Sequence, residues 1–251
     1  MKKKGPIAVF TALRWEAQAV TGALSNVRAE HSKVWRGLAG DSEVLVVAGG
    51  IGPARARRAV EAFAAHSLRA VISAGCAGAL RRESRVGELV LAREVKMYAG
   101  GGDGAMRSFG VDDDLWRAAK EAAGRARLAT AEGPLFTSER VLFTPTEKAR
   151  CRRDTGAVAV EMESGVHAAF ATEVGAPFLA LRVILDRLDT AIPDFGALLS
   201  PKGGGRIKPL RVAGLLLSRP RQVAAIWALG RARRRAAVSL RAVFASLFPL
   251  L

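Results

Sequence analysis

Apolar and polar positions follow one another along the chain in a way that predicts strands and helices in turn. Short apolar runs typical of buried strands lie at residues 7–11, 43–48, 70–74, 88–92, 158–160 and 177–184. Apolar residues recur with helical spacing at residues 15–24, 53–65, 113–126, 146–152 and 163–173. This alternation indicates an α/β fold with a mostly parallel or mixed sheet that is covered on both faces.

Acidic residues stand at several of the expected strand ends, which is where α/β folds bind their ligands. Glu161 and Glu163 lie between an expected strand and the next helix, where early acids are also common for purely structural reasons. Asp186 ends the last expected strand, which also contains Arg182, and Glu16 follows the first strand. If these strands are neighbours, the acids Glu16, Glu163 and Asp186 converge on one pocket.

Two glycine clusters also follow expected strands. The segment "AGGIGP", around Gly50, leads into a helix, and the segment "AGCAG", around Gly75, follows a buried run. Glycine allows backbone N–H groups to approach a ligand closely, so either cluster can bind phosphate or ribose oxygens. Neither has the spacing of a dinucleotide fingerprint or a P-loop, and tight strand-to-helix turns explain both clusters better than ligand binding does.

Composition supports a globular chain. Its 251 residues are 50% hydrophobic, which is enough for one large domain or two small ones. The two cysteines, Cys76 and Cys151, lack metal-ligand spacing and give no disulfide framework, so we expect a reducing cytoplasm. The basic start resembles a signal peptide, but Arg14 and Glu16 interrupt its short apolar run, and we interpret that run as a strand. No apolar stretch reaches the roughly 20 residues of a membrane-spanning helix.

The positive charge is concentrated at the C-terminal end. Residues 201–251 contain 11 Lys and Arg and no Asp or Glu, so they supply most of the net charge of +16. After the loop "SPKGGGR" and the apolar segment "LRVAGLLLSRP", the sequence predicts a basic amphipathic helix at residues 223–248. Its apolar side comprises Leu240, Val243, Phe244, Leu247 and Phe248.

Such a helix binds an acidic membrane surface, nucleic acid or an acidic protein, or simply packs on its own domain. Few aromatic residues and no nucleic-acid-binding motif favour the membrane over nucleic acid. We therefore expect residues 207–251 to contact an anionic membrane surface.

Four motifs in order carry a family resemblance. "GGIG", "VISAGCAGAL", "AVEMES" and "PFLALRVILD" resemble the nucleoside phosphorylase and nucleosidase superfamily, especially its methylthioadenosine/S-adenosylhomocysteine nucleosidase branch. This resemblance covers about residues 6–190. The segment after Asp189 resembles the hopanoid-associated phosphorylase group, whose members remove adenine from adenosylhopane during hopanoid side-chain assembly.

The resemblance implies a role for each acid. Cleavage of an N-glycosidic bond builds positive charge on the ribose and negative charge on the departing base. Asp186 corresponds to the acid that protonates the adenine at nitrogen 7, although Arg182 nearby would oppose its protonated form. Glu163 corresponds to the carboxylate that binds the ribose hydroxyls and Met162 to the residue beneath the sugar, which leaves Glu161 with a structural role.

The resemblance leaves the nucleophile open. Glu16 corresponds to the glutamate that activates water in nucleosidases, which favours hydrolysis. Many phosphorylases have a phosphate-binding arginine where this chain has Ser73, and Cys76 replaces a common serine. Inorganic phosphate remains an alternative co-substrate, with Arg14 and the turn around Gly50 as its contacts.

Other expectations concern the rest of the pocket. Val141 and Leu142 correspond to the segment that borders the adenine. Together with Met162, Cys76, Gly75 and Gly50 they complete the predicted substrate-binding set. His31, His66 and His167 match no catalytic position, and His167 reads as a packing residue.

The sequence thus predicts a nucleoside phosphorylase-like three-layer catalytic domain at residues 1–200 and a basic helical extension at residues 201–251. We expect an enzyme that releases adenine from adenosylhopane without a cofactor or metal, as a homo-oligomer on the inner membrane surface of the cytoplasm. One alternative is a soluble methylthioadenosine/S-adenosylhomocysteine or futalosine nucleosidase. Another is a non-catalytic nucleoside- or nucleic-acid-binding protein.

Overall fold

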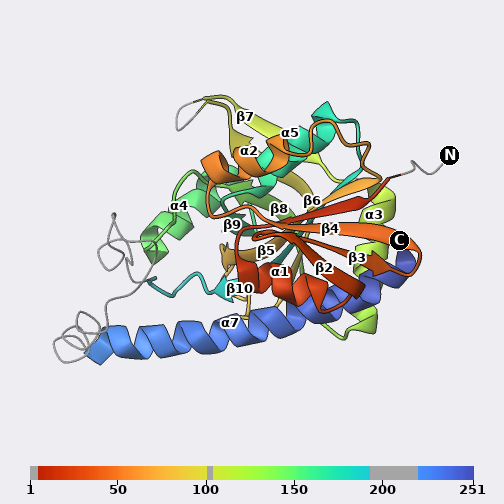
Figure 1. The fold of residues 1–251 in the computed structure, drawn as a ribbon. Coiled ribbons are helices and arrows are strands. Elements are labelled where there is room, and N and C mark those ends of the chain that lie inside the picture. The colour runs from red at the N-terminus through yellow and green to blue at the C-terminus, as the bar shows by residue number, and fades with distance from the viewer. Residues whose placement is uncertain (1–4, 101–103, 193–219) are drawn as a thin grey trace.

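A computed structural model describes residues 5–100, 104–192 and 220–251, with the backbone alone for residues 220–227 (Figure 1). The strands are β1 (Ile7–Thr11), β2 (Ser25–His31), β3 (Val34–Ala39), β4 (Ser42–Ala48), β5 (Ala70–Ala79), β6 (Leu89–Tyr98), β7 (Met106–Gly110), β8 (Thr130–Thr137), β9 (Ala159–Glu161) and β10 (Phe178–Asp186). The helices are α1 (Arg14–Thr21), α2 (Pro53–Glu61), α3 (Asp113–Arg125), α4 (Pro145–Thr155), α5 (Ser164–Glu173) and α7 (Pro220–Leu247), which leads into a short 3₁₀ helix, η2 (Phe248–Leu250).

Within the described residues, the strands form one ten-stranded mixed sheet. β1 lies between β4 and β5 and is parallel to both, and β5 is parallel to β10. β10 also pairs with β6, which continues through β8 and β9 back to β5. These five strands therefore close into a ring, while β4, β3 and β2 extend the sheet on the far side of β1.

Helices cover both faces of this sheet, as the sequence predicts. One buried apolar cluster joins the sheet to α1, α3 and α7, and a second joins its other face to α2 and α5. Figure 1 shows α2 and α5 above the sheet and α1 and α7 below it. The prediction of a three-layer α/β fold with a central mixed sheet is confirmed.

All of the predicted strands and helices are present, with ends that differ by a few residues. The sequence pattern missed β2, β3, β7 and β8. Every residue of β2 is exposed and most are polar, so this strand has no apolar run to reveal it. β8 contains Gly133 and Pro134, which interrupt a strand pattern and normally mark a turn.

Helix α7 packs on the domain that precedes it. Its apolar residues Leu240, Val243, Phe244 and Leu247, and Phe248 after it, are all at most 4% exposed and belong to the core cluster of α1 and α3. Of the alternatives that the sequence leaves open for this apolar stripe, the structure shows packing on the protein's own domain, so the stripe is not free to enter a membrane. The expected boundary at residue 200 and the segments "SPKGGGR" and "LRVAGLLLSRP" lie largely outside the described residues. Among the helices described, none has the length and apolar character needed to cross a bilayer.

We predict that Phe244→Ala lowers the free energy of unfolding by about 3–5 kcal/mol, because it leaves a cavity in a packed core. Val238 lies on the same helix and is 69% exposed, so Val238→Ala is the matched control. It should change the free energy of unfolding by less than about 0.5 kcal/mol. Urea unfolding measures both. Equal small losses would show that α7 does not dock on the core.

Candidate active site

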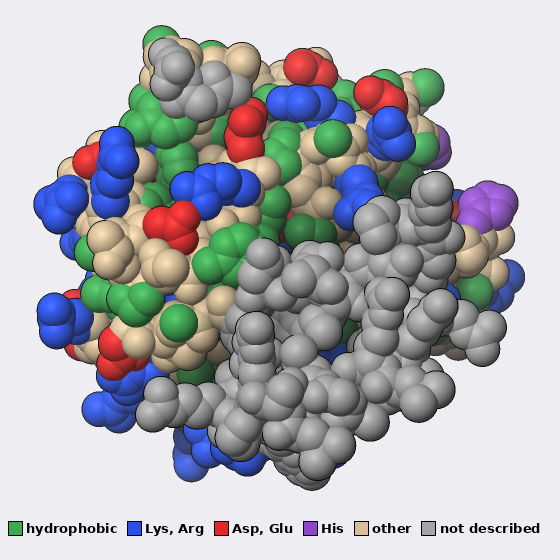
Figure 2. All heavy atoms as spheres, turned by 90° about the vertical axis from the view of Figure 1, so that its left-hand side faces the viewer, with side chains coloured by type: hydrophobic (Ala, Val, Ile, Leu, Met, Phe, Trp, Pro, Cys, Tyr) green, Lys and Arg blue, Asp and Glu red, His purple; other side chains and the backbone are tan. Residues whose placement is uncertain are grey.

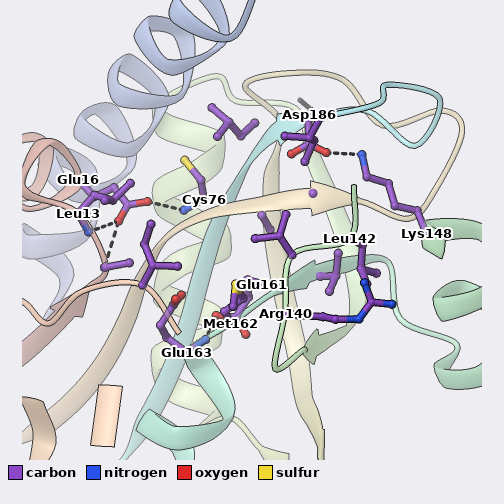
Figure 3. A pocket seen from close by; sticks show the side chains of 18 residues that line it. Leu13, Glu16, Cys76, Arg140, Leu142, Lys148, Glu161, Met162, Glu163 and Asp186 are labelled. Atoms are coloured by element: carbon purple, nitrogen blue, oxygen red, sulfur yellow. Dashed lines mark hydrogen bonds and ion pairs between the residues drawn. The ribbon is translucent and has the colours of Figure 1, made fainter. Parts of the chain in front are cut away.

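One cavity lies near the ends of β1, β5, β9 and β10, among the segments that follow or face these strands. Its volume is about 200 Å³. Figure 3 shows Glu16 and Glu163 at one end and Asp186 at the other, with Met162 beside Glu163. The structure thus brings together the three acids that the sequence places at strand ends.

Glu16 is held by three backbone N–H groups. It lies in the first turn of α1 and is 2% exposed. Its Oε2 accepts from the N–H groups of Ala12 (3.1 Å) and Leu13 (2.8 Å), and its Oε1 accepts from that of Cys76 (3.0 Å). Burial raises the pKa of Glu16, while the Arg182 charge and these three hydrogen bonds lower it. The two N–H groups on Oε2 use both of its lone pairs, whereas Oε1 keeps one free lone pair and can still accept a proton from a nucleophile.

Arg182 is a buried cation behind the acids. It belongs to β10 and is 1% exposed. Its Nη2 donates to Glu161 and to Ser73 Oγ (2.9 Å), and its Nε donates to Ser164 Oγ (3.1 Å). Its Nη1 is buried without a hydrogen-bond partner in the described residues. A Cβ on Gly75 would lie 2.4 Å from this Nη1 and 3.0 Å from Glu16 Oε1, so only glycine fits between the two groups.

Glu161 and Glu163, at the junction between β9 and α5, differ in how many hydrogen bonds they make within the chain. Glu161 accepts from Arg182, from Thr137 and from the N–H groups of Glu163 (2.9 Å) and Ser164 (2.8 Å), so its oxygens are occupied by the protein itself. This agrees with a structural role for Glu161.

Glu163 has fewer partners within the chain. Its Oε1 accepts the Gly52 N–H at 2.8 Å, and its Oε2 lies 3.8 Å from Arg182 Nη2. Burial, followed by the nearby Glu161 charge, raises the pKa of Glu163 to about 7. Its second oxygen remains available to a ligand in the cavity, which it lines.

Asp186 reaches the cavity through an irregularity in β10. The register of β10 against β5 shifts between Ile184 and Asp186, and this bulge allows both Leu185 and Asp186 to line the cavity. Gly78 opposite has no side chain; a Cβ there would lie 3.1 Å from Asp186 Oδ2. Burial raises the pKa of Asp186, and Lys148 lowers it.

The cation beside Asp186 is not the expected one. Lys148 Nζ donates to Asp186 Oδ2, whereas Arg182 pairs with Glu161 and Glu163 at the other end of the cavity. The prediction that Arg182 opposes the protonation of Asp186 is wrong, because the bulge separates the two side chains that a regular strand would place on one face. Lys148 has that position instead.

The rest of the lining is mostly apolar. Met162, Val141 and Leu142 line the cavity as the sequence predicts, and so does Cys76. Burial raises the pKa of the Cys76 thiol well above its usual range, so this sulfur stays protonated and is a poor nucleophile. The further apolar lining residues are Ala12, Leu13, Ile51, Ala77, Val160, Leu185 and Ile192.

Several predicted contacts lie away from the cavity. Gly50 and Gly75 do not line it: Gly50 packs against the Arg55 side chain, and Gly75 makes room for Arg182. Arg14 is exposed and stacks over Trp35, 5.8 Å from the ring centre, so the structure does not bring it to the site. Ser73 is fully buried beneath Arg182.

The histidines also lie outside the cavity. His167 is 2% exposed, bonds Ser73 Oγ through Nδ1 at 2.8 Å and stacks on Phe10. Burial lowers its pKa to about 3, so the ring is neutral. His31 and His66 are exposed.

Sequence reasoning missed Lys148, Arg140 and Ile192 among the lining residues. Lys148 lies within a predicted helix, where a lysine is normally expected to face the solvent. The sequence pattern does not distinguish it from Arg150 or Arg152 on the same helix. Among the described residues, no three His, Cys, Asp or Glu side chains gather as a metal site would require.

Comparisons with known proteins follow the same lines. The chain is 32% identical over 159 residues to a DeoD-type purine nucleoside phosphorylase of Myxococcus xanthus; the match covers 59% of this chain and 64% of that relative's length. The crystal structure of a 5′-methylthioadenosine/S-adenosylhomocysteine nucleosidase from Neisseria meningitidis, in complex with methylthio-immucillin-A, superposes with a TM-score of 0.75 at 22% identity, covering 99% of this chain and 100% of the other. Futalosine hydrolase of Helicobacter pylori superposes with a TM-score of 0.69 at 17% identity, covering 95% and 97%.

The two structural neighbours share the fold at identities too low to carry more than the fold. The sequence itself carries the family: residues 6–200 match the phosphorylase superfamily. This match covers most of the chain and includes all four acids that line the cavity, Glu16, Glu161, Glu163 and Asp186. The chain therefore belongs to the phosphorylase superfamily.

Proposed function

We propose that this protein cleaves the N-glycosidic bond of an adenine nucleoside, with water as the nucleophile. The observation that carries the proposal is the division of the cavity into an end with Glu16 and Glu163 and an end with Asp186 and Lys148. Positive charge develops on the ribose and negative charge on the base as the bond breaks. The carboxylates of the cavity can stabilise the positive charge on the ribose, and the acid Asp186 with the cation Lys148 can stabilise the negative charge on the base.

Asp186 acts on the departing base. Its raised pKa favours the protonated form, which donates to nitrogen 7 of the purine as the bond breaks. Val141 and Leu142 line this end and give the flat ring an apolar slot. The purine then leaves as a neutral molecule, which lowers the barrier to cleavage.

Glu163 binds the ribose hydroxyls in this proposal. Its free Oε2 accepts from the hydroxyl groups, while the Gly52 N–H fixes Oε1. Met162 lines the cavity beside Glu163 and packs beneath the sugar. The negative charge of Glu163 also favours the cationic sugar of the transition state.

Water is the nucleophile that the surroundings of Glu16 favour. Glu16 lines the cavity and accepts the proton of the attacking water through the free lone pair of its Oε1. Phosphate would need cations free to bind it. Of the lining residues, Arg140 pairs with Glu147 and Lys148 with Asp186, and Arg14 points elsewhere.

The substrate that we propose is adenosylhopane, as the resemblance of the C-terminal segment implies. Leu13, Leu185 and Ile192 line the cavity, and Ile51 at its edge is 44% exposed. An apolar group attached to the 5′ carbon would find these side chains. Adenine and ribosylhopane would be the products of hydrolysis.

The structural neighbours suggest the main alternative, a methylthioadenosine/S-adenosylhomocysteine or futalosine nucleosidase. Equal kcat/KM for methylthioadenosine and adenosylhopane would favour that alternative over a hopanoid substrate. A protein that binds nucleosides without turnover would release no adenine from either compound.

We also propose that the protein works at an anionic membrane surface, through the exposed side of α7 rather than its buried stripe. Arg231, Arg233, Arg234 and Arg235 are exposed there, and no acidic residue follows residue 200. Figure 2, which views the side with the strand ends, shows basic and acidic side chains intermingled over the described part of that face. The charged residues of α7 itself are all basic, and each Lys or Arg near an anionic membrane surface contributes about 1 kcal/mol to binding.

The function is tested by the products formed in ¹⁸O-labelled water without phosphate. We predict adenine and a ribosyl product with one ¹⁸O atom, seen by mass spectrometry. Asp186→Asn should lower kcat by about 10²–10⁴-fold, the usual contribution of a general acid, while its melting temperature stays close to wild type. Turnover only with added phosphate would replace water by phosphate, and near-normal Asp186→Asn turnover would remove the acid from the mechanism.

The raised pKa of Glu163 predicts a pH-dependent KM. Above pH 7 Glu163 is a carboxylate that accepts from the ribose hydroxyls, and below pH 7 it gains a proton and loses this capacity. KM should therefore rise up to about tenfold per pH unit as pH falls below 7. Glu163→Gln, which does not titrate, should give a KM that is high and independent of pH; a wild-type KM that is flat from pH 6 to 8 would refute the assignment.

Membrane contact is tested by flotation with phosphatidylglycerol vesicles. Arg231→Glu/Arg234→Glu should abolish co-flotation, because it reverses the charge on the exposed side of α7. Arg57→Glu/Arg58→Glu makes the same charge change on α2, across the sheet, and should leave flotation unchanged. Equal flotation by both variants, or equal binding to phosphatidylcholine vesicles, would exclude this surface.

A further inference from the structure

Lys148 is an unusual lysine. It belongs to α4 and is 1% exposed, whereas lysine is almost never fully buried without a partner. Its Nζ donates to Asp186 Oδ2, to the Arg187 carbonyl at 2.8 Å and to the Thr190 carbonyl at 3.0 Å. These three acceptors use all three N–H donors of an ammonium group, so the charge is fixed at one place.

The helix that carries Lys148 is anchored at both ends. Thr144 caps its start and accepts the Glu147 N–H at 3.2 Å, while the Glu147 side chain accepts the Thr144 N–H at 3.0 Å. Gly156 ends the helix in the left-handed conformation, with φ 69°. These caps set the rotation of α4, and Lys148 is the charged residue of α4 that reaches the cavity.

Charged and titratable groups around Asp186 come from three elements. Lys148 faces it from α4, and Cys76 faces it from β5 as a protonated thiol. On its own strand and beyond, Arg182 is engaged with Glu161, and Arg187 turns outward to pair with Asp189. Lys148 is therefore the cation in contact with Asp186 among the described residues.

We propose that Lys148 is a positioning residue for Asp186, and that its ammonium group holds the acid at the base end of the cavity and stabilises the carboxylate formed when Asp186 gives up its proton. This inference rests on the proposed function. In the step, the O–H bond of Asp186 breaks and a bond from its proton to nitrogen 7 forms. The electron pair of the N-glycosidic bond moves to the purine, and Lys148 keeps its three protons throughout.

A lysine that acts through Asp186 has a distinctive effect on the pH profile. Lys148 lowers the pKa of Asp186 against the effect of burial, so its removal leaves burial alone and raises that pKa further. Asp186 then stays protonated to higher pH, and the basic limb of the kcat profile moves to higher pH. The maximum of kcat falls, because the new carboxylate lacks its counter-charge.

The experiment compares Lys148→Met and Lys148→Arg with wild type on an adenine nucleoside from pH 5 to 10. Lys148→Met should lower kcat on the order of 10- to 100-fold with KM changed less than about twofold, because general-acid catalysis contributes to the rate and not to ground-state binding. Lys148→Arg keeps the charge and should restore part of kcat and of the pH profile. Melting temperatures show that each variant is folded.

A second substrate separates catalysis from structure. 4-Nitrophenyl β-D-ribofuranoside has a leaving group that needs no proton, so Lys148→Met should cleave it at the wild-type rate. If Lys148→Met slows both substrates equally, or leaves the pH profile in place, Lys148 serves only the fold and the inference is overturned.

The failure of this inference can be told from the failure of the proposed function. Normal Lys148→Met turnover together with an inactive Asp186→Asn enzyme would overturn the role of Lys148 alone. Normal turnover by Asp186→Asn would overturn the role of Asp186 as the acid, and with it both proposals.

Discussion

The site depends on one buried cation, the guanidinium group of Arg182. It extends from the middle of β10 and contacts groups of β5, β9 and α5. The acids Glu161 and Glu163 are buried beside it, and their charges would repel one another without it. Removing one partner from such a buried cluster typically costs about 3–5 kcal/mol, because the remaining charges are left uncompensated. The position of Arg182 therefore fixes where Glu161 and Glu163 can lie, and its charge also lowers the pKa of Glu16 against the effect of burial.

The environment of each acid then decides what it can do. Glu161 is saturated by Arg182, Thr137 and backbone N–H groups, and becomes part of the framework. Glu163 keeps a free oxygen and a raised pKa. Asp186 is buried beside a separate cation, Lys148, and this second ion pair lies at the other end of the cavity from Glu16 and Glu163. Carboxyl groups of similar intrinsic acidity thereby serve different chemical roles.

Much of this arrangement follows from the sequence. The apolar runs that become β1, β5 and β10 are unmistakable, and acids at their ends predict a shared site because neighbouring parallel strands end together. β9 is an instructive exception: it is antiparallel to β5, so Met162 and Glu163 reach the cavity by running back along β5. The sequence motif thus identified Met162 and Glu163 as residues of the cavity, although it did not predict the direction of β9.

Other features depend on tertiary contacts that no local pattern contains. The β10 bulge changes which side of the strand faces the cavity, so the partner of Asp186 is a lysine from α4 and not Arg182. Gly75 was expected to face a ligand, but it provides the space for Arg182. The apolar stripe of α7 reads the same whether it meets a membrane or a protein core, and only the presence of α1, α3 and β10 decides between them.

The most direct test of the role of Arg182 is a double-mutant cycle with Arg182→Gln and Glu161→Gln, measured as free energies of unfolding in urea. If Arg182 organises the buried acids, each single change is strongly destabilising and the double change costs much less than their sum, with a coupling free energy of about 1.5–3 kcal/mol. Costs that add to within about 0.5 kcal/mol would contradict the account, because the two residues would then contribute to the fold independently.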